Sequence, residues 1–137
     1  VIGKGLDEIL RHAARLRADR LVIDDLRSKD ALSALLGAAA TRGVLVGMHA
    51  PTPAAAIEQL EMFAQIALGG QRASLAGLIA QAFQLLVHVG ADGSGARRVL
   101  TISEVRGARD ETLDLATLYR YDGGFRSTDQ RAGFLPS

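Results

Sequence analysis

The fold of this chain is decided by the stretch Leu21-Val22-Ile23-Asp24-Asp25-Leu26-Arg27 and by a second stretch further along, Val44-Leu45-Val46-Gly47-Met48-His49-Ala50. Apolar runs that end in polar residues are typical of two neighbouring parallel strands whose tips carry polar chemistry. The spacing between Asp25 and His49 is about that of a strand-helix-strand unit. Because ligands bind at the carboxyl edge of a parallel sheet, we expect the two polar tips to lie together there.

Length and composition exclude several classes of protein. A chain of 137 residues with 48% apolar composition suits one globular domain, and the absence of Cys excludes disulfides and thiolate metal sites. We find no signal-like start and no unbroken apolar run long enough to span a membrane, which favours the cytosol. A net charge of +1 and 4% aromatic residues give no reason to expect a nucleic-acid partner. The chain begins with Val1 rather than Met, so we expect a piece of a longer protein.

Apolar periodicity predicts four helices, over residues 6–16, 30–40, 52–68 and 74–83. Thr52 is the expected N-cap of the third helix and Pro53 its first residue. Strands are predicted over 20–25 and 44–48, and a buried strand over 85–89. Alternating patterns over 97–104 and 112–121 indicate an antiparallel hairpin, with a further turn at 122–124. The last ten residues are expected to be loosely ordered.

Four side chains near the two tips could carry chemistry. A carboxylate at Asp24 or Asp25 can hold Mg²⁺ through water or orient an attacking water, and only one of two adjacent strand residues can face a shared ligand. The alternative is a pair of solvated acids. His49 could sense a terminal phosphate or could simply be packed, and Arg27 could pair with an acid, reach a phosphate or stay solvated. The other two histidines, His12 and His88, are interpreted as structural.

Several catalytic motifs are absent from the sequence. No G-x-x-x-x-G-K-[ST] loop occurs, and the short Gly3-Lys4-Gly5 lacks both the loop length and the Ser or Thr. Without that loop, nothing in these residues cradles a β-phosphate. The chain also contains no H-E-x-x-H, no G-x-S-x-G and no paired metal-ligand spacing.

Four ordered blocks of this chain match a known pattern: Leu16–Arg27, Gly43–Ala50, Gln59-Leu60-Glu61-Met62 and Arg97-Arg98-Val99 through Glu104-Val105. They resemble the ATPases of type II and type IV secretion and pilus assembly, most closely the tight-adherence branch, and the resemblance covers nearly the whole chain. In that family the first block is the Walker B region, with an Arg-x-x-Pro-Asp-Arg lead-in and a Val-Gly-Glu-Val/Ile-Arg strand tip. The later blocks are a His box, an Arg-Leu-Glu-Met helix and an Arg-Arg-Val…Thr-Glu-Val hairpin.

The resemblance implies an α/β fold, a partial RecA-like P-loop NTPase whose residues 1–137 form the C-terminal portion of the core and lack the Walker A segment. Asp25 takes the Walker B glutamate position, as catalytic carboxylate and Mg²⁺ ligand, and His49 the catalytic His-box position. Asp24 and Arg27 take positions beside the nucleotide. In the complete protein, ATP and Mg²⁺ would bind there, although we expect neither tight binding nor hydrolysis from this piece alone.

The family also implies a setting for the complete protein. Its members are motors that couple ATP binding and hydrolysis to protein secretion or pilus assembly. They assemble as homo-oligomeric rings, expected to be hexameric, in the cytoplasm at the periphery of the inner membrane, and their partners are the platform proteins of that membrane. A piece without the central strand of such a sheet exposes apolar edges, so we expect self-association.

The sequence also departs from the family pattern. Asp24-Asp25 stands where the family has Gly-Glu, Ala18 replaces the lead-in Pro, Gly47 stands where a Thr precedes the His box, and Pro51 replaces an Asn. A carboxylate displaced by about 1 Å can cost on the order of 100-fold in rate.

A second reading is therefore a degenerate relative that serves as a non-hydrolysing assembly or regulatory module. A third reading, a phosphoacceptor receiver domain, needs a later strand-tip Asp and a Lys near the end of the chain. His49 and Val89 stand at the later tips instead, and no Lys follows Lys29.

Overall fold

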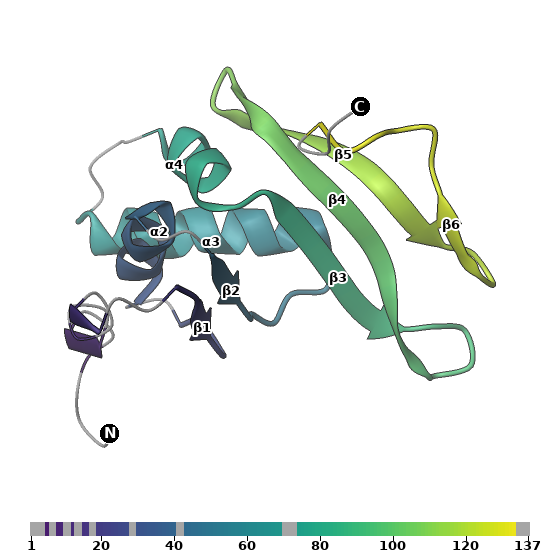
Figure 1. The fold of residues 1–137 in the computed structure, drawn as a ribbon, viewed down its shortest axis with the longest axis horizontal. Coiled ribbons are helices and arrows are strands. Elements are labelled where there is room, and N and C mark those ends of the chain that lie inside the picture. Colours follow the sequence, from purple (N-terminus) through teal and green to yellow (C-terminus); the bar gives the residue numbers. More distant parts are fainter. Residues whose placement is uncertain are drawn as a thin grey trace.

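The computed structural model describes residues 5, 8–9, 12, 15–16, 19–27, 30–40, 43–69 and 74–133. Within these residues the protein is a mixed α/β structure with a small parallel sheet, a larger antiparallel sheet and a helical layer (Figure 1). The predicted helix over 6–16 falls largely outside the described residues. No helix of the described part is long and apolar enough to cross a membrane.

The parallel sheet is the predicted strand-helix-strand unit. Strand β1 (Leu21–Ile23) and strand β2 (Val44–Val46) pair in parallel, and helix α2 (Ala31–Ala40) connects them. Both strands are shorter than the expected 20–25 and 44–48. At the tip of β1, Asp25 adopts a left-handed φ of 52° and turns the chain away from the extended direction.

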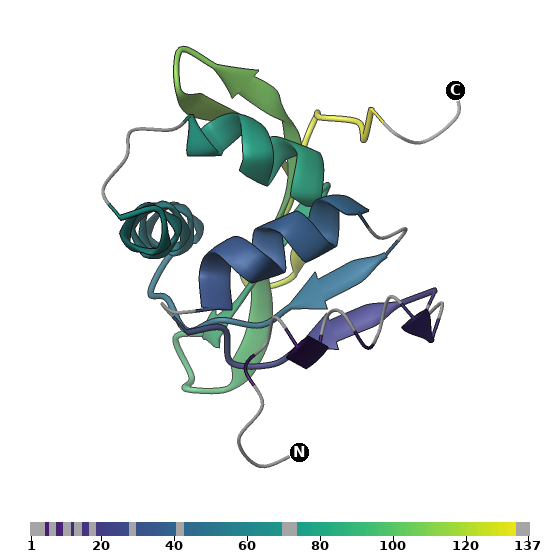
Figure 2. The ribbon, with the colours of Figure 1, turned by 90° about the vertical axis from the view of Figure 1, so that its left-hand side faces the viewer.

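A helical layer forms the core. Helix α3 (Pro53–Ala67) and helix α4 (Leu75–Ala82) pack with α2 (Figure 2). The centre holds many alanines, which let the helices approach closely, together with Leu35 and Ile79, whose side chains are fully buried. The Thr52 Oγ1 accepts a hydrogen bond from the Ala55 N–H at 3.1 Å and caps α3 as predicted, with Pro at the start of the helix.

The antiparallel sheet has the order β3-β4-β5-β6 and comprises β3 (Leu85–Ala91), β4 (Arg97–Arg109), β5 (Thr112–Tyr121) and β6 (Phe125–Ser127). The predicted strand over 85–89 is confirmed, but the expectation that it is buried is wrong, because alternate residues of β3 are exposed. The hairpin over 97–121 is confirmed, and its first strand continues to Arg109 through two register shifts opposite β5. The sheet is therefore larger than the predicted hairpin, since β3 and β6 join its two edges.

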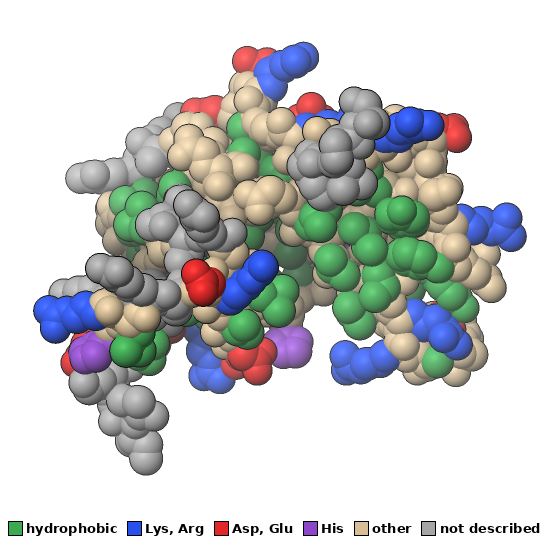
Figure 3. Space-filling view, viewed as in Figure 1, with side chains coloured by type: hydrophobic (Ala, Val, Ile, Leu, Met, Phe, Trp, Pro, Cys, Tyr) green, Lys and Arg blue, Asp and Glu red, His purple; other side chains and the backbone are tan. Residues whose placement is uncertain are grey.

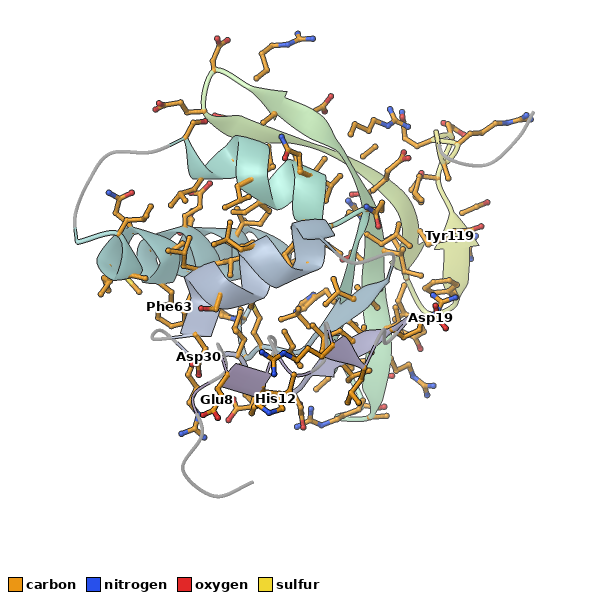
Figure 4. All side chains as sticks on the ribbon, turned by 60° about the vertical axis from the view of Figure 1, so that its left-hand side comes forward. Glu8, His12, Asp19, Asp30, Phe63 and Tyr119 are labelled. Carbon is orange, nitrogen blue, oxygen red and sulfur yellow. The ribbon has the colours of Figure 1, made fainter. Side chains whose placement is uncertain are left out.

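One face of this sheet is apolar and only partly covered. Leu85, Val87 and Val89 of β3 are each more than 40% exposed, and so is Phe125 of β6. The Phe125 ring stacks on Tyr119 at 5.2 Å between centroids. Hydrophobic side chains gather over the antiparallel sheet in the space-filling view (Figure 3), and Tyr119 lies on the opposite side of the molecule from Phe63 of α3 (Figure 4).

The expectation of a loosely ordered C-terminal segment is wrong for residues 128–133. The buried Glu104 accepts a hydrogen bond from the Gly133 N–H at 2.8 Å. Arg106 donates to the Gln130 Oε1 at 3.0 Å and to the Arg131 carbonyl at 2.9 Å. These side chains tie the segment to β4, a long-range contact that the local sequence does not reveal. Residues 134–137 lie outside the described part.

Candidate functional site

The tips of β1 and β2 are joined by backbone hydrogen bonds beyond the ends of the strands. The Gly47 N–H donates to the Ile23 carbonyl at 2.8 Å, and the Leu26 N–H donates to the Gly47 carbonyl at 2.9 Å. Leu26 is 5% exposed and packs into the core. Because both sides of the Asp24-Asp25 turn are anchored in this way, the Asp24 side chain and the Asp25 backbone lie against Gly47.

Asp25 and Arg27 form an ion pair at this rim. The Oδ2 atom of Asp25 accepts from the Arg27 Nη2 at 2.8 Å and from its Nε at 3.2 Å. These hydrogen bonds, together with the charge of Arg27 and a smaller contribution from His49, hold the pKa of the Asp25 carboxyl below its usual value. The same pair raises the pKa of Arg27. Asp25 is therefore ionised at neutral pH, as a metal ligand or water-orienting group must be.

The structure places all four predicted site residues at the two neighbouring strand tips. Asp25 contacts Arg27 directly, His49 is close enough to influence the Asp25 carboxyl, and Asp24 lies against Gly47. All four are exposed. Of the alternatives left open for Arg27, pairing with an acid is the one observed. The two acids leave the strand direction in a turn, so the argument that they point to opposite faces of a strand does not apply.

A groove of about 390 Å³ begins at this rim and runs between β2 and β3. Its walls are mainly apolar and come from β2, the start of α3 and β3, including Val46, Ile57 and Val87. Polar groups enter it only at a few places within the described residues: His49, Thr52, His88 and Arg97. Such a combination of apolar walls and few polar groups is typical of sites that bind a ligand or another segment of chain.

The sequence argument missed two residues of this groove. His88 is interpreted above as structural, and Arg97 is named there only within the hairpin block, yet both line the groove. The sequence offered no signal for this, because an apolar run does not reveal which neighbour a strand faces, and both His88 and Val87 line the groove.

A second polar cluster lies in the turn between β3 and β4. The Asp92 carboxylate accepts from Ser94, from the Ala96 N–H and from the Arg98 Nε at 2.7 Å. The hydrogen bonds with Ser94 and Arg98 hold the pKa of Asp92 far below its usual value. The Arg98 guanidinium also lies 5.5 Å from the centre of the Tyr121 ring. Ser94, Ala96 and Arg98 all follow Asp92 within the turn and the start of β4, so these hydrogen bonds stabilise the turn.

The described residues contain no group of three or more His, Cys, Asp or Glu side chains that could hold a metal ion. A cation at the rim would therefore have to share its coordination with water or with a bound ligand. Mg²⁺ is usually bound in this way, through one or two carboxylates and substrate phosphates.

Comparison with known proteins gives two relatives, both from Mycobacterium tuberculosis. The “Putative conjugal transfer protein MT3759” of strain CDC 1551 / Oshkosh and the “Putative conjugal transfer protein Rv3659c” of strain ATCC 25618 / H37Rv are each 33% identical to this chain over 120 residues. The match covers 85% of this chain and 33% of each relative, so the chain spans about a third of the length of the curated relatives it matches. No protein-family model matches the chain.

Proposed function

We propose that this chain is the C-terminal portion of the nucleotide-hydrolysing core of a secretion-type motor ATPase that acts in conjugal transfer or a similar type IV process. One observation carries the proposal: parallel pairing of β1 and β2 gathers Asp25, Arg27 and His49 at one rim beside an apolar groove. The names of the relatives support the transfer setting. The four sequence blocks that resemble secretion ATPases support the chemistry.

In this proposal each rim residue has a separate role. Asp25, ionised and exposed, orients the attacking water and a water of the Mg²⁺ shell. Arg27 exchanges its Asp25 partner for a phosphate oxygen, which its planar guanidinium recognises well. His49 donates to the terminal phosphate. The carboxylate oxygens at the rim suit Mg²⁺, and the bound ion would neutralise charge on the phosphates.

The loop that cradles the phosphates must come from elsewhere in a longer protein. In the described residues β2 pairs on one side with β1, and β3 pairs on one side with β4, so the groove separates two strand edges that have no strand partner. Unpaired edges with apolar walls favour extension of the sheet by another segment. The proposal also includes a homo-oligomeric ring, expected to be hexameric, at the cytoplasmic face of the inner membrane. The platform proteins of that membrane are its proposed partners.

Turnover of ATP by the longer protein tests this assignment. Asp25→Asn should abolish Mg²⁺-dependent hydrolysis while nucleotide binding persists, because the amide keeps the shape and loses the charge. Asp25→Glu should raise turnover by restoring the missing methylene. Asp114→Asn, an exposed acid on β5, is the matched control and should change neither.

Two results would contradict the assignment. A longer protein that binds no nucleotide excludes an ATPase role of either kind. A longer protein that binds nucleotide but does not hydrolyse it, with or without Asp25→Glu, supports the alternative of a non-hydrolysing assembly or regulatory module.

A further inference from the structure

Asp24 and Gly47 lie against each other at the tips of β1 and β2. A Cβ atom at position 47 would lie 3.3 Å from the Asp24 Oδ1, 3.8 Å from the Asp25 N and 3.9 Å from the Asp24 Cα. The two backbone distances are ordinary van der Waals contacts, whereas the contact with the carboxylate is tight. The Asp24 carboxylate therefore occupies the space into which a side chain at position 47 would extend.

The backbone leaves little freedom to relieve that contact. The Gly47 N–H and carbonyl are both hydrogen bonded, to Ile23 and Leu26, and Leu26 is buried in the core. A larger residue at position 47 can therefore be accommodated chiefly by turning the Asp24 side chain away from the rim. The residue at position 47 and the orientation of the Asp24 side chain are therefore coupled.

We propose that Asp24 and Gly47 are a matched pair, in which Asp24 supplies from β1 the polar group that the resembling family pattern carries on β2. That pattern has Gly at the position of Asp24 and Thr at the position of Gly47. In this chain the polar side chain follows β1 and the glycine follows β2, the reverse of the family pattern. The polar side chain occupies the same space at the rim in both arrangements. Asp24 is thus a positioning residue of the proposed nucleotide site, and this part of the inference rests on the proposed function.

The exchange also changes what the rim can recognise. A threonine hydroxyl both donates and accepts hydrogen bonds, whereas an ionised carboxylate only accepts. Asp24 can accept from water bound to a divalent cation but cannot donate to a phosphate oxygen. The substrate class that fits is a nucleotide accompanied by a hydrated divalent cation, rather than the free nucleotide anion, which the carboxylate repels.

A double-mutant cycle on this chain tests the steric part. Gly47→Thr should raise the unfolding equilibrium constant about threefold or more beyond its effect in an Asp24→Gly background, since neighbouring side chains couple and distant ones do not. Gly124→Thr is the control, because a Cβ at that glycine meets nothing within 4 Å. Its effect should be the same in both backgrounds. Independent effects of Asp24→Gly and Gly47→Thr on urea unfolding would overturn the matched pair.

Nucleotide affinity of the longer protein, measured with ATP in Mg²⁺ and in EDTA, tests the role of Asp24. Asp24→Asn should weaken binding by roughly tenfold in Mg²⁺ and leave it unchanged or tighter in EDTA, as expected for one charged partner lost. An equal change in both conditions, or no change, would overturn the role of Asp24. Absence of ATP binding by the wild-type protein would instead overturn the proposed function, while the unfolding cycle would still report on the matched pair.

Discussion

Glu104→Ala should destabilise the chain strongly, because this carboxylate links β4 to the C-terminal segment. The side chain of Glu104 is 6% exposed. Its Oε1 accepts from the Gly133 N–H at 2.8 Å, and its Oε2 accepts from the Arg106 Nε at 3.1 Å. Alanine removes both acceptors and leaves Arg106 without its counter-ion, although Gln130 and the Arg131 carbonyl still accept from its other nitrogens.

The magnitude follows from these two contacts. A hydrogen bond to a charged group contributes about 1.5–3 kcal/mol, and the Arg106 contact lies at the low end because that side chain is 35% exposed. Together they give a loss of about 3 kcal/mol. For a domain of this length, the midpoint of thermal unfolding should fall by roughly 10 °C. Glu104→Gln keeps the shape and the acceptor for Gly133, so it should cost about half as much.

Thermal unfolding followed by circular dichroism measures this loss, and hydrogen exchange locates it. The amide of Gly133 should lose its protection in Glu104→Ala, whereas exchange of the amides in α2 should accelerate only through the global loss of stability. Glu58→Ala, an exposed acid on α3, is the matched control. A fall of less than about 3 °C for Glu104→Ala would refute the reasoning.

Three other side chains give separate tests. Asp92→Asn should destabilise the chain at pH 7, and the difference in stability from wild type should shrink as the pH falls below about 4. The reason is that a carboxylate with a lowered folded-state pKa loses its contribution to stability when it is protonated. A difference that grows in acid would contradict this. Arg27→Ala should raise the pKa of Asp25 toward its usual value in carboxyl ¹³C titrations, and an unchanged pKa would show that the ion pair is not formed in solution. Thr52→Ala should cost about 1 kcal/mol in urea unfolding through loss of the α3 cap, and a change within about 0.3 kcal/mol would exclude that cap.

Features set by local chemistry were predictable from the sequence. Helix α3 begins after Thr52 as expected, because a cap and a first-turn Pro act within a few residues. The pairing of β1 with β2 was also predictable, since a strand, a short helix and another strand leave one favourable arrangement. The shared rim of Asp25 and His49 follows directly from that pairing.

Features set by distant neighbours were not predictable. The apolar run of β3 indicates a strand but does not show that its partner is β4 and that one of its faces stays exposed. The hydrogen bond from the Gly133 N–H to Glu104 joins residues that are far apart in the chain. The left-handed turn at Asp25 ends the strand direction on which a strand-based reading of the two acids depends.

The departures from the family pattern carry unequal weight for function. Asp24 and Gly47 compensate each other in space, so they count as one change. Pro51 precedes the Thr52 cap of α3, where a missing N–H interrupts no helical hydrogen bond. Two changes remain: Ala18, which lies outside the described residues, and the missing methylene at Asp25.

The backbone supplies a reason for an aspartate at position 25. Asp adopts a left-handed φ, here 52°, more readily than Glu does. Asp25→Glu in the longer protein therefore has two opposing effects. It extends the carboxylate toward the nucleotide, and it strains the backbone at position 25. In a motor, the variant should unfold more easily and still hydrolyse ATP faster, whereas in a non-hydrolysing module it should only unfold more easily.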